Sequence, residues 1–427
     1  MDRVVLSGQQ QAAIAAILYW YRYERHHQQV ARVWGYAGTG KSTITRYVIE
    51  ELGLEPVNRQ AGTGGVLFAA FTGKAALVMT RKGTPASTIH SLIYRVSEAT
   101  PEEIERVTQE LATLRASLHA MGPAERSFTE TRIRRLELRL ADIHQPRFVL
   151  NEQSLLRDAD LVVLDEVSMV GPEMASDLLA FGKPTLVLGD PGQLPPIKGE
   201  GAFTSAVADV MLTEVHRQAG ASAIVRLATL ARQGLPIPYG AHDAHVAKMR
   251  RSDLQPPHLL KGGQVICGRN ATRVFLNNAM KREAGFPSAY PSGRGEKIIC
   301  LRNRHDLGLV NGMFLSLSDI QDEGELAFSA AVRTEDGAEL SSRQHFYKGH
   351  FDDHVAPDAD RQRRDWRELR GLIESVWGYA ITCHKAQGSQ WENVIVYDDG
   401  LGRTAADRAR WLYTAITRAE RGLVLLD

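Results

Sequence analysis

The stretch Gly35-Tyr36-Ala37-Gly38-Thr39-Gly40-Lys41-Ser42 fits the phosphate-binding pattern G-x-x-x-x-G-K-[ST] at every position. An apolar run at residues 30–34 precedes it, and residues 43–49 follow it with apolar side chains at helical spacing. In such a strand, loop and helix, backbone N–H groups hold phosphate oxygens, the lysine adds positive charge, and the serine hydroxyl can bind Mg²⁺. This context disfavours a chance glycine-rich turn and predicts a nucleotide-binding α/β core.

Composition sets the limits within which this core is interpreted. A chain of 427 residues with 44% hydrophobic content is long enough for about two to four domains. Its 51 basic and 50 acidic residues nearly cancel, so a nucleic-acid site must be a local cleft and not a global positive field. The three cysteines, Cys267, Cys300 and Cys383, are far apart in or beside apolar runs, which predicts reduced thiols packed in a core.

Residues 1–11 lack the basic and then apolar pattern of a signal peptide. No apolar run approaches the roughly eighteen residues that a membrane-spanning helix needs. We therefore expect a cytoplasmic protein without a membrane partner.

Polar residues follow three further apolar runs of the first half. Residues 66–71 lead into Thr72-Gly73-Lys74, residues 161–164 into Asp165-Glu166, and residues 185–188 into a loop that contains Gln193. Ligands of open α/β sheets bind at the carboxyl ends of the strands. There, Asp165 can bind Mg²⁺ and Glu166 can take the proton of an attacking water. Gln193 can bond the γ-phosphate, although a simple turn also explains its Gly-Asp-Pro-Gly context.

Other candidates stay open on the residues alone. One of Gln9, Gln10 and Gln11 can read adenine through its amide, although each alone fits a solvated helix start better. Arg217 fits a γ-phosphate contact and a surface arginine equally well. Arg418 belongs to the threonine-arginine pair that ends a predicted helix at residues 411–419 and is the better arginine finger, a role worth about three to five powers of ten in rate.

An insertion of a different kind lies at residues 100–146. Apolar residues repeat there at spacings of three and four, first at Ile104, Val107, Leu111, Leu114, Leu118 and Met121, then at Ile133, Leu136, Leu140 and Ile143. Each run begins with a capping box, and Gly122-Pro123 separates them. The pattern predicts an antiparallel helical hairpin; a plain structural arm is the alternative to a functional one.

The second half contains buried strands at residues 264–267, 297–301, 393–397 and 423–426, which predict a second α/β core. Residues 311–375 change to short alternating strands, the pattern of a small inserted β module. The loop at residues 379–388 is rich in donors suited to a phosphodiester backbone, among them Thr382, His384 and Lys385.

Ten stretches occur in the order found in the superfamily-1 DNA helicases of the RecD/Dda group, which the chain resembles over nearly its whole length. They are residues 6–10, 35–43, 72–76, 88–91, 165–169, 189–196, 217–218, 311–312, 384–388 and 412–418. The resemblance implies an α/β fold with two RecA-like parallel-sheet cores. The first would span residues 1–200 with a helical-hairpin or pin insertion at 93–150, and the second residues 201–427 with a small SH3-like β-barrel at 311–375.

The resemblance also implies an ATP-dependent DNA helicase that moves 5′ to 3′ on single-stranded DNA, with Mg²⁺ and ATP bound between the cores. The implied catalytic residues are Lys41, Glu166, Gln193, Arg217 and Arg418, and Mg²⁺ would be held by Ser42 and Asp165. The implied nucleotide-binding residues are Gln10, Gly38, Thr39, Gly40, Lys41, Ser42, Thr43 and Gly388. The implied DNA contacts are Thr72, Lys74, His90, Thr382, His384 and Lys385.

The implied partners are single-stranded and forked duplex DNA, bound by a monomer active in replication, repair or recombination. Relatives carry a short strand-separating pin where this chain has its helical insertion. We therefore expect residues 103–143 to form a coiled arm at the fork junction, with residues 94–97 and 147–150 paired as its stem. The motor subunit of a larger repair or recombination complex is one alternative. A P-loop switch ATPase is another, which Gln193 and the His384-Lys385 loop disfavour.

Overall fold

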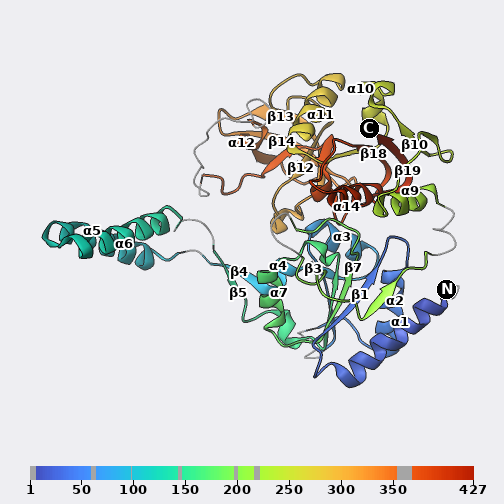
Figure 1. Ribbon diagram of the computed structural model, residues 1–427. Helices are drawn as coiled ribbons and strands as arrows, with labels where there is room; N and C mark the ends of the chain where they lie inside the picture. The colour runs from blue at the N-terminus through green and yellow to red at the C-terminus, as the bar shows by residue number, and fades with distance from the viewer. Residues whose placement is uncertain are drawn as a thin grey trace. The chain divides into compact units, whose positions relative to one another are not determined.

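The computed structural model describes residues 6–58, 64–97, 99–142, 147–196, 201–215, 222–352 and 368–427 (Figure 1). The chain divides into two compact units. The larger unit comprises Met1–Ile93, Gln153–Ala359 and Ile373–Asp427, and the smaller one Tyr94–Glu152 and Asp360–Leu372. Each is described by itself below.

Six strands form the first sheet, in the spatial order β3-β2-β6-β7-β1-β8. They are β1 (Val30–Gly35), β2 (Val66–Ala70), β3 (Ala86–Thr88), β6 (Leu161–Asp165), β7 (Thr185–Gly189) and β8 (Val210–Leu212). The central strands β6 and β7 are apolar and buried, as strands covered on both faces must be. All the pairings are parallel, so the carboxyl ends of the strands lie along one edge.

The first sheet and its helices are called the first core below. The helices are α1 (Gly8–Tyr19), α2 (Lys41–Leu52), α3 (Gly73–Arg81), α4 (Ile89–Ile93) and α7 (Pro172–Leu179). Ile17 of α1 and Ile44 of α2 pack against Val33 of β1 in one buried cluster. Because β8 pairs with β1 in this sheet, the first core extends to Leu212, and the predicted boundary at residue 200 is too early. A local pattern does not reveal which distant strand a short run will pair with.

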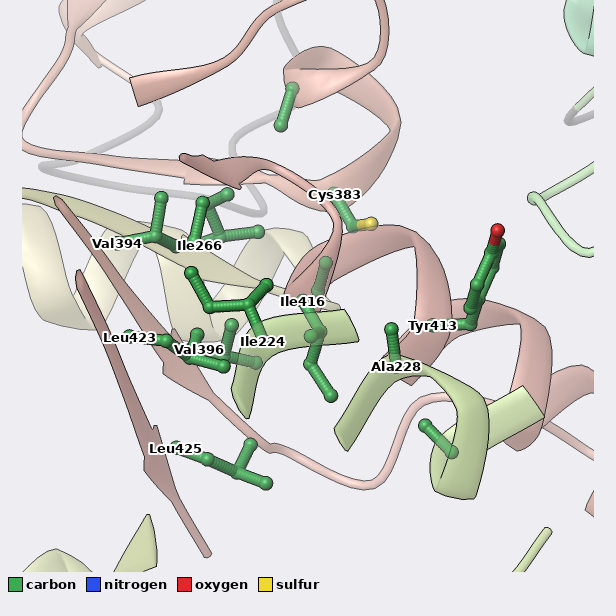
Figure 2. Packing of buried hydrophobic residues seen from close by; sticks show 14 of the residues in the cluster. Ile224, Ala228, Ile266, Cys383, Val394, Val396, Tyr413, Ile416, Leu423 and Leu425 are labelled. Atoms are coloured by element: carbon green, nitrogen blue, oxygen red, sulfur yellow. The ribbon is translucent and has the colours of Figure 1, made fainter. Parts of the chain in front are cut away.

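The second sheet has the order β17-β11-β18-β19-β10-β9 and, with its helices, is called the second core. Its strands are β9 (Gly240–Ala241), β10 (Val246–Met249), β11 (Gln264–Cys267), β17 (Ala380–Thr382), β18 (Trp391–Tyr397) and β19 (Ala419–Leu426). Its helices are α9 (Ala223–Arg232), α10 (Pro256–Lys261), α11 (Asn270–Glu283), α13 (Cys383–Ala386) and α14 (Ala405–Ile416). Figure 2 shows Ile224 of α9 and Ile416 of α14 packed with Val396 and its apolar neighbours on β18 and β19.

A separate antiparallel sheet, called the β module below, has the order β15-β14-β13-β12-β16. It consists of β12 (Glu296–Cys300), β13 (Phe314–Asp322), β14 (Ala327–Thr334), β15 (Gln344–Tyr347) and β16 (Ser375–Trp377), with α12 (Gly349–Asp352) beside it. We expected the strand at residues 297–301 to belong to the second core. That prediction is wrong, because the strand that forms there, β12, belongs to the β module. Ile298 of β12 pairs with Leu315 and Trp377, and its short apolar run carried no signal of these partners. The comparison of this module with an SH3-like barrel stays a prediction.

The smaller unit, called the helical arm, contains β4 (Tyr94–Ser97), α5 (Pro101–Ser117), α6 (Pro123–Asp142) and β5 (Arg147–Leu150). The helices bury Val107, Leu111, Ile133 and Leu136 against one another. Ion pairs join Glu103 to Arg139 and Glu110 to Arg132, so the two helices run antiparallel, and a third pair joins Arg115 to Glu137. The predicted helical hairpin and stem are confirmed, since Tyr94 pairs with Leu150 and Ser97 with Arg147.

The described residues include all three cysteines. Cys267, Cys300 and Cys383 are buried and free, as predicted. In that part of the chain, no helix combines the length and apolar character that crossing a bilayer requires.

Candidate functional site

The phosphate-binding loop connects β1 to α2 and is shaped by glycine. Gly38 and Gly40 have φ values of 81° and 83°, in the left-handed region that favours glycine. A Cβ added at Gly35 would lie 2.6 Å from Thr39 Oγ1, so the loop can fold back on itself only with glycine there. Ser42 and Thr43 lie in the first turn of α2, where unpaired backbone N–H groups attract anions.

Lys41 is bonded within its own loop. Its Nζ donates to the Gly35 carbonyl at 2.6 Å and to the Tyr36 carbonyl at 3.3 Å. Thr39 Oγ1 also donates to the Tyr36 carbonyl, at 2.8 Å. The ammonium is therefore held by carbonyl groups of its own loop, and phosphate binding by Lys41 stays a prediction.

Gln10 is the upstream glutamine that reaches this loop. Its Oε1 accepts from the Ser7 N–H at 3.0 Å, completing a capping box at the start of α1, and its Nε2 donates to the Thr39 carbonyl at 3.1 Å. The side chain is 2% exposed, so it is not the solvated helix start that its sequence context favoured. Gln9 instead accepts from the N–H groups of Thr213 and Glu214 after β8. Adenine reading by Gln10 stays a prediction.

Asp165 is the last residue of β6, and Glu166 follows it, so two carboxylates are adjacent at the end of the strand. Burial, together with the Glu166 charge, raises the pKa of Asp165 to about 6, and the Lys41 charge acts in the opposite direction. Glu166 has a φ of 55°, a left-handed conformation that is unusual for a residue other than glycine, and its N–H donates to Asp165 Oδ1 at 2.8 Å. Strain of this kind concentrates at functional sites.

The residues predicted to bind Mg²⁺ fit that ion. Ser42 and Asp165 line the same cavity, of about 550 Å³. A hydroxyl and a carboxylate are hard oxygen ligands of the kind that Mg²⁺ takes from a protein while substrate phosphates and water complete its shell. The cavity continues over Phe68 and Met79, between α2 and α3.

The loop after β7 makes contacts with the second core that the sequence did not predict. Tyr413 of α14 donates its hydroxyl proton to Asp190 Oδ2 at 2.6 Å and accepts from the Ala37 N–H of the phosphate-binding loop at 2.9 Å. The next residue, Thr414, accepts from the Leu194 N–H at 2.9 Å. Tyr413 and Thr414 both lie within a helix that the sequence predicts. Helical spacing, however, does not indicate which residues of another core a side chain will contact.

Gln193 lies on the other side of this loop. Among the residues that the structure describes, its buried Oε1 has no hydrogen-bond partner, and the residue lines a cavity of about 240 Å³ together with Ser168, Thr204 and Arg410. A buried carbonyl oxygen without a donor is costly, which is characteristic of a group that awaits a ligand or a rearrangement.

Of the two arginines predicted to contact the γ-phosphate, Arg418 lies within the described residues. Arg418 is 3% exposed, and its guanidinium donates to the Thr414 carbonyl, the Ser389 carbonyl and Thr417 Oγ1, all within the second core. It therefore does not touch the phosphate-binding loop in this structure. Arg217 lies outside the described residues.

Two threonines cap helices at the strand ends where DNA contacts are predicted. Thr72 Oγ1 accepts from the Ala75 N–H at the start of α3, and Thr382 Oγ1 from the Lys385 N–H at the start of α13. Gly388, with a φ of 73°, brings the two segments together, since a Cβ there would lie 2.6 Å from Thr72 Oγ1. This position groups Gly388 with the predicted DNA contacts and not with the phosphate-binding loop.

The basic residues of this region are partly enclosed. Lys74 is 6% exposed; burial lowers its pKa, and Glu335 opposes that effect from 3.0 Å. Its ammonium also lies over the rings of Phe314 and Trp391. Burial lowers the pKa of Lys385 to about 8, and Lys385 Nζ donates to Asn311 Oδ1.

Burial likewise lowers the pKa values of His90 and His384, so both imidazoles are neutral at lower pH than usual. Neutral imidazoles can donate one hydrogen bond to a phosphate without carrying charge. DNA contact by all these residues stays a prediction.

Two known protein families match the chain, one over its first half and one near its carboxyl end. The AAA domain family matches residues 5–245, and the UvrD-like helicase C-terminal domain family matches residues 378–426. The chain is 27% identical over 277 residues to the ATP-dependent RecD2 DNA helicase of Deinococcus radiodurans, covering 61% of this chain and 35% of that protein. It thus spans about a third of the length of this curated relative.

Solved structures of the Bacteroides Pif1 helicase have a similar fold. One is bound to single-stranded DNA (TM-score 0.54, 18% identity), and another to ADP-AlF3 and single-stranded DNA (TM-score 0.53, 16% identity). Each covers 99% of this chain and 92% of the Pif1 chain, which supports a RecA-like α/β fold. Because the first family match alone covers more than half of the residues, the chain belongs to the AAA domain family, and it is similar to superfamily-1 helicases of the RecD and Pif1 kind.

Proposed function

We propose that the protein is an ATP-dependent DNA helicase that moves 5′ to 3′ along single-stranded DNA and separates duplex DNA. The observation that carries the proposal is the contact of the second core with two loops that follow strands of the first core. Tyr413 of the second core bonds the phosphate-binding loop of the first, while Gly388 packs against Thr72. A nucleotide bound at the phosphate-binding loop can therefore change the position of the second core, and with it the distance between Gly388 and Thr72. The RecD2 name of the curated relative agrees with this activity.

In the proposed reaction, Lys41 leaves the Gly35 and Tyr36 carbonyls and binds the phosphates, and Glu166 accepts the proton of the attacking water. Ser42 and Asp165 would hold Mg²⁺, which supplies positive charge to the phosphates. Gln193 would turn its unpaired carbonyl toward the water, and Arg418 and Arg217 would approach the γ-phosphate as the cores close. The enclosed position of Arg418 makes its release from Thr414 part of that closure.

Single-stranded DNA would bind through backbone contacts of Thr72, Lys74, His90, Thr382, His384 and Lys385. Since these residues come from both cores, closing on ATP and opening after hydrolysis would alternate the grip of the two halves. Phosphate contacts make such binding weaken with salt, by a slope of roughly −0.7 for each phosphate neutralised.

The helical arm would act at the fork junction. In its stem, Tyr94, Val96, Phe148 and Leu150 point to the same face of the two-stranded ribbon, because residues two apart share a face and Val96 pairs with Phe148. Val96 and Phe148 are 56% and 55% exposed. An exposed apolar and aromatic face fits the faces of unpaired bases.

The motor subunit of a larger repair or recombination complex is a second candidate. It differs from the first in requiring other chains for unwinding. We expect the chain alone, as a monomer, to be active on a fork.

The deciding experiment is steady-state ATP hydrolysis with and without oligothymidylate. The wild-type rate should rise on adding DNA, whereas Lys41→Ala should abolish both rates because it removes the ammonium that lies within the phosphate-binding loop. Forks with a single 5′ or 3′ tail then give the polarity, and only the 5′-tailed fork should be unwound. A wild-type rate that DNA leaves unchanged would overturn the helicase proposal.

A further inference from the structure

The phosphate-binding loop and α14 are joined by one buried hydroxyl. Tyr413 is 2% exposed, and Figure 2 shows its oxygen turned away from the apolar cluster around Ile416. The Ala37 backbone N–H can only donate, so the phenol oxygen must accept from it and its proton must go to Asp190. The directions of both bonds are therefore fixed.

Asp190 and Gly192 hold the Tyr413 hydroxyl in place. Asp190 is 3% exposed and uses both oxygens, Oδ1 accepting from the Gly192 N–H and Oδ2 from Tyr413. A Cβ on Gly192 would lie 2.9 Å from the Tyr413 ring, so glycine allows the ring to reach the loop. A buried tyrosine with two satisfied bonds is a rigid link.

The link continues along α14 to the predicted arginine finger. Thr414 accepts from the Leu194 N–H through its side chain, and its carbonyl accepts from Arg418 Nε at 3.1 Å. Tyr413 and Thr414 thus attach one turn of α14 to the two nucleotide-site loops, and Arg418 is held by that same turn.

We propose that Tyr413 is a positioning residue for ATP hydrolysis, whose hydroxyl keeps α14, and with it Arg418, in register with the phosphate-binding loop. The inference rests on the proposed ATPase function and adds to it the residue that connects the nucleotide loops to the finger. Tyr413 itself touches neither the water nor the γ-phosphate. Nucleotide binding that redirects the Ala37 N–H would release the phenol and let this turn of α14 move.

The test uses Tyr413→Phe in the full chain, because phenylalanine keeps the ring against Gly192 and removes both bonds. Without DNA, kcat should fall about tenfold, equivalent to about 1.4 kcal/mol, while KM for ATP changes less than about threefold. Tyr379→Phe is the matched control: Tyr379 is also buried, and its hydroxyl accepts from the Lys297 N–H, outside the nucleotide loops. It should change kcat less than about twofold.

A double-mutant cycle separates positioning from general loosening. In an Arg418→Ala background, Tyr413→Phe should cost less than about twofold more, because the residue that it positions is already gone. A Tyr413→Phe variant that behaves like Tyr379→Phe would overturn the proposal, as would a full tenfold loss on top of Arg418→Ala. If Tyr413→Phe does not fold, Asp190→Asn carries the same cycle, since it leaves the Ala37 bond but replaces one of the two acceptor oxygens of Asp190 by an NH2 group, which cannot accept from Tyr413 or Gly192.

The readout is hydrolysis in the absence of DNA. A wild-type protein that hydrolyses ATP without responding to DNA would therefore defeat the helicase proposal and leave this test intact.

Discussion

At the scale of single residues, the nucleotide site retains features that cost stability. Asp165 has a raised pKa because its carboxylate is buried beside Glu166, and Glu166 has a left-handed backbone. A non-glycine residue in that conformation costs about 1–2 kcal/mol. Such costs persist where the geometry serves binding or chemistry, which agrees with the roles predicted for the pair.

Asp165→Asn should stabilise the protein without nucleotide while abolishing Mg²⁺-dependent hydrolysis. The folded pKa of about 6 lies above the ordinary 3.8, so the folded state favours protonated Asp165. Wild type should therefore gain stability as pH falls from above 6 towards 4, and at pH 8 the variant should be more stable by roughly 1–3 kcal/mol.

Urea unfolding at pH 8 and pH 5 measures this difference, which should shrink at pH 5 because the wild-type carboxyl is then protonated. A variant that is no more stable than wild type at pH 8 would contradict the raised pKa.

At the scale of elements, an acidic turn of the β module holds the helix predicted to bind DNA. Glu335 and Asp336 follow β14 and pair with Lys74 and Arg81 of α3. Lys74 and Glu335 have side-chain exposures of only 8% and 22%, so solvent screens this pair weakly. A DNA phosphate that binds Lys74 must displace Glu335.

Glu335→Gln should therefore tighten single-stranded DNA binding, with Kd falling about threefold to tenfold, because phosphate no longer competes with a carboxylate. The slope of log K against log salt should steepen by about 0.7, the contribution of one more phosphate. Fluorescence anisotropy across a salt series gives both values.

Glu339→Gln is the control, since Glu339 pairs with Arg333 on the exposed part of the same module and should leave both values unchanged. Lower stability of Glu335→Gln with an unchanged slope would show Lys74 to be a structural lysine.

Sequence periodicity predicted the helices, strands and loops better than it predicted which of them contact one another. The phosphate-binding loop, the strand ends at Asp165 and Gln193, and the heptads of the helical arm depend on neighbouring residues, and these were predicted. The sheet to which β12 belongs, the contact of Gln10 with Thr39 and the bridge through Tyr413 each depend on residues distant in sequence. Pattern and propensity are local, so such pairings lie beyond them.

At the scale of the whole molecule, the two compact units divide the predicted tasks. The nucleotide loops and the capped helices at Thr72 and Thr382 belong to the larger unit, whereas the exposed apolar face of the stem belongs to the helical arm. A unit with its own buried cluster and ion pairs can be shortened without removing the packing of the other.

Deleting residues 103–143, with a short linker in their place, should leave DNA-stimulated hydrolysis within about twofold of wild type and reduce unwinding of a 5′-tailed fork about tenfold or more. Phe148→Ser tests the stem more finely, because it removes one exposed ring from the apolar face and keeps both helices. It should lower fork unwinding with little change in hydrolysis.

Leu138→Ser is the matched control for the stem variant, since Leu138 is also apolar and is 64% exposed on α6, away from the stem. If the apolar face contacts separated bases, Leu138→Ser should unwind the fork like wild type and Phe148→Ser should not. Equal loss in both variants would assign the effect to the helical arm as a whole, and unchanged unwinding by the deletion would remove the arm from strand separation and leave it a structural or partner-binding element.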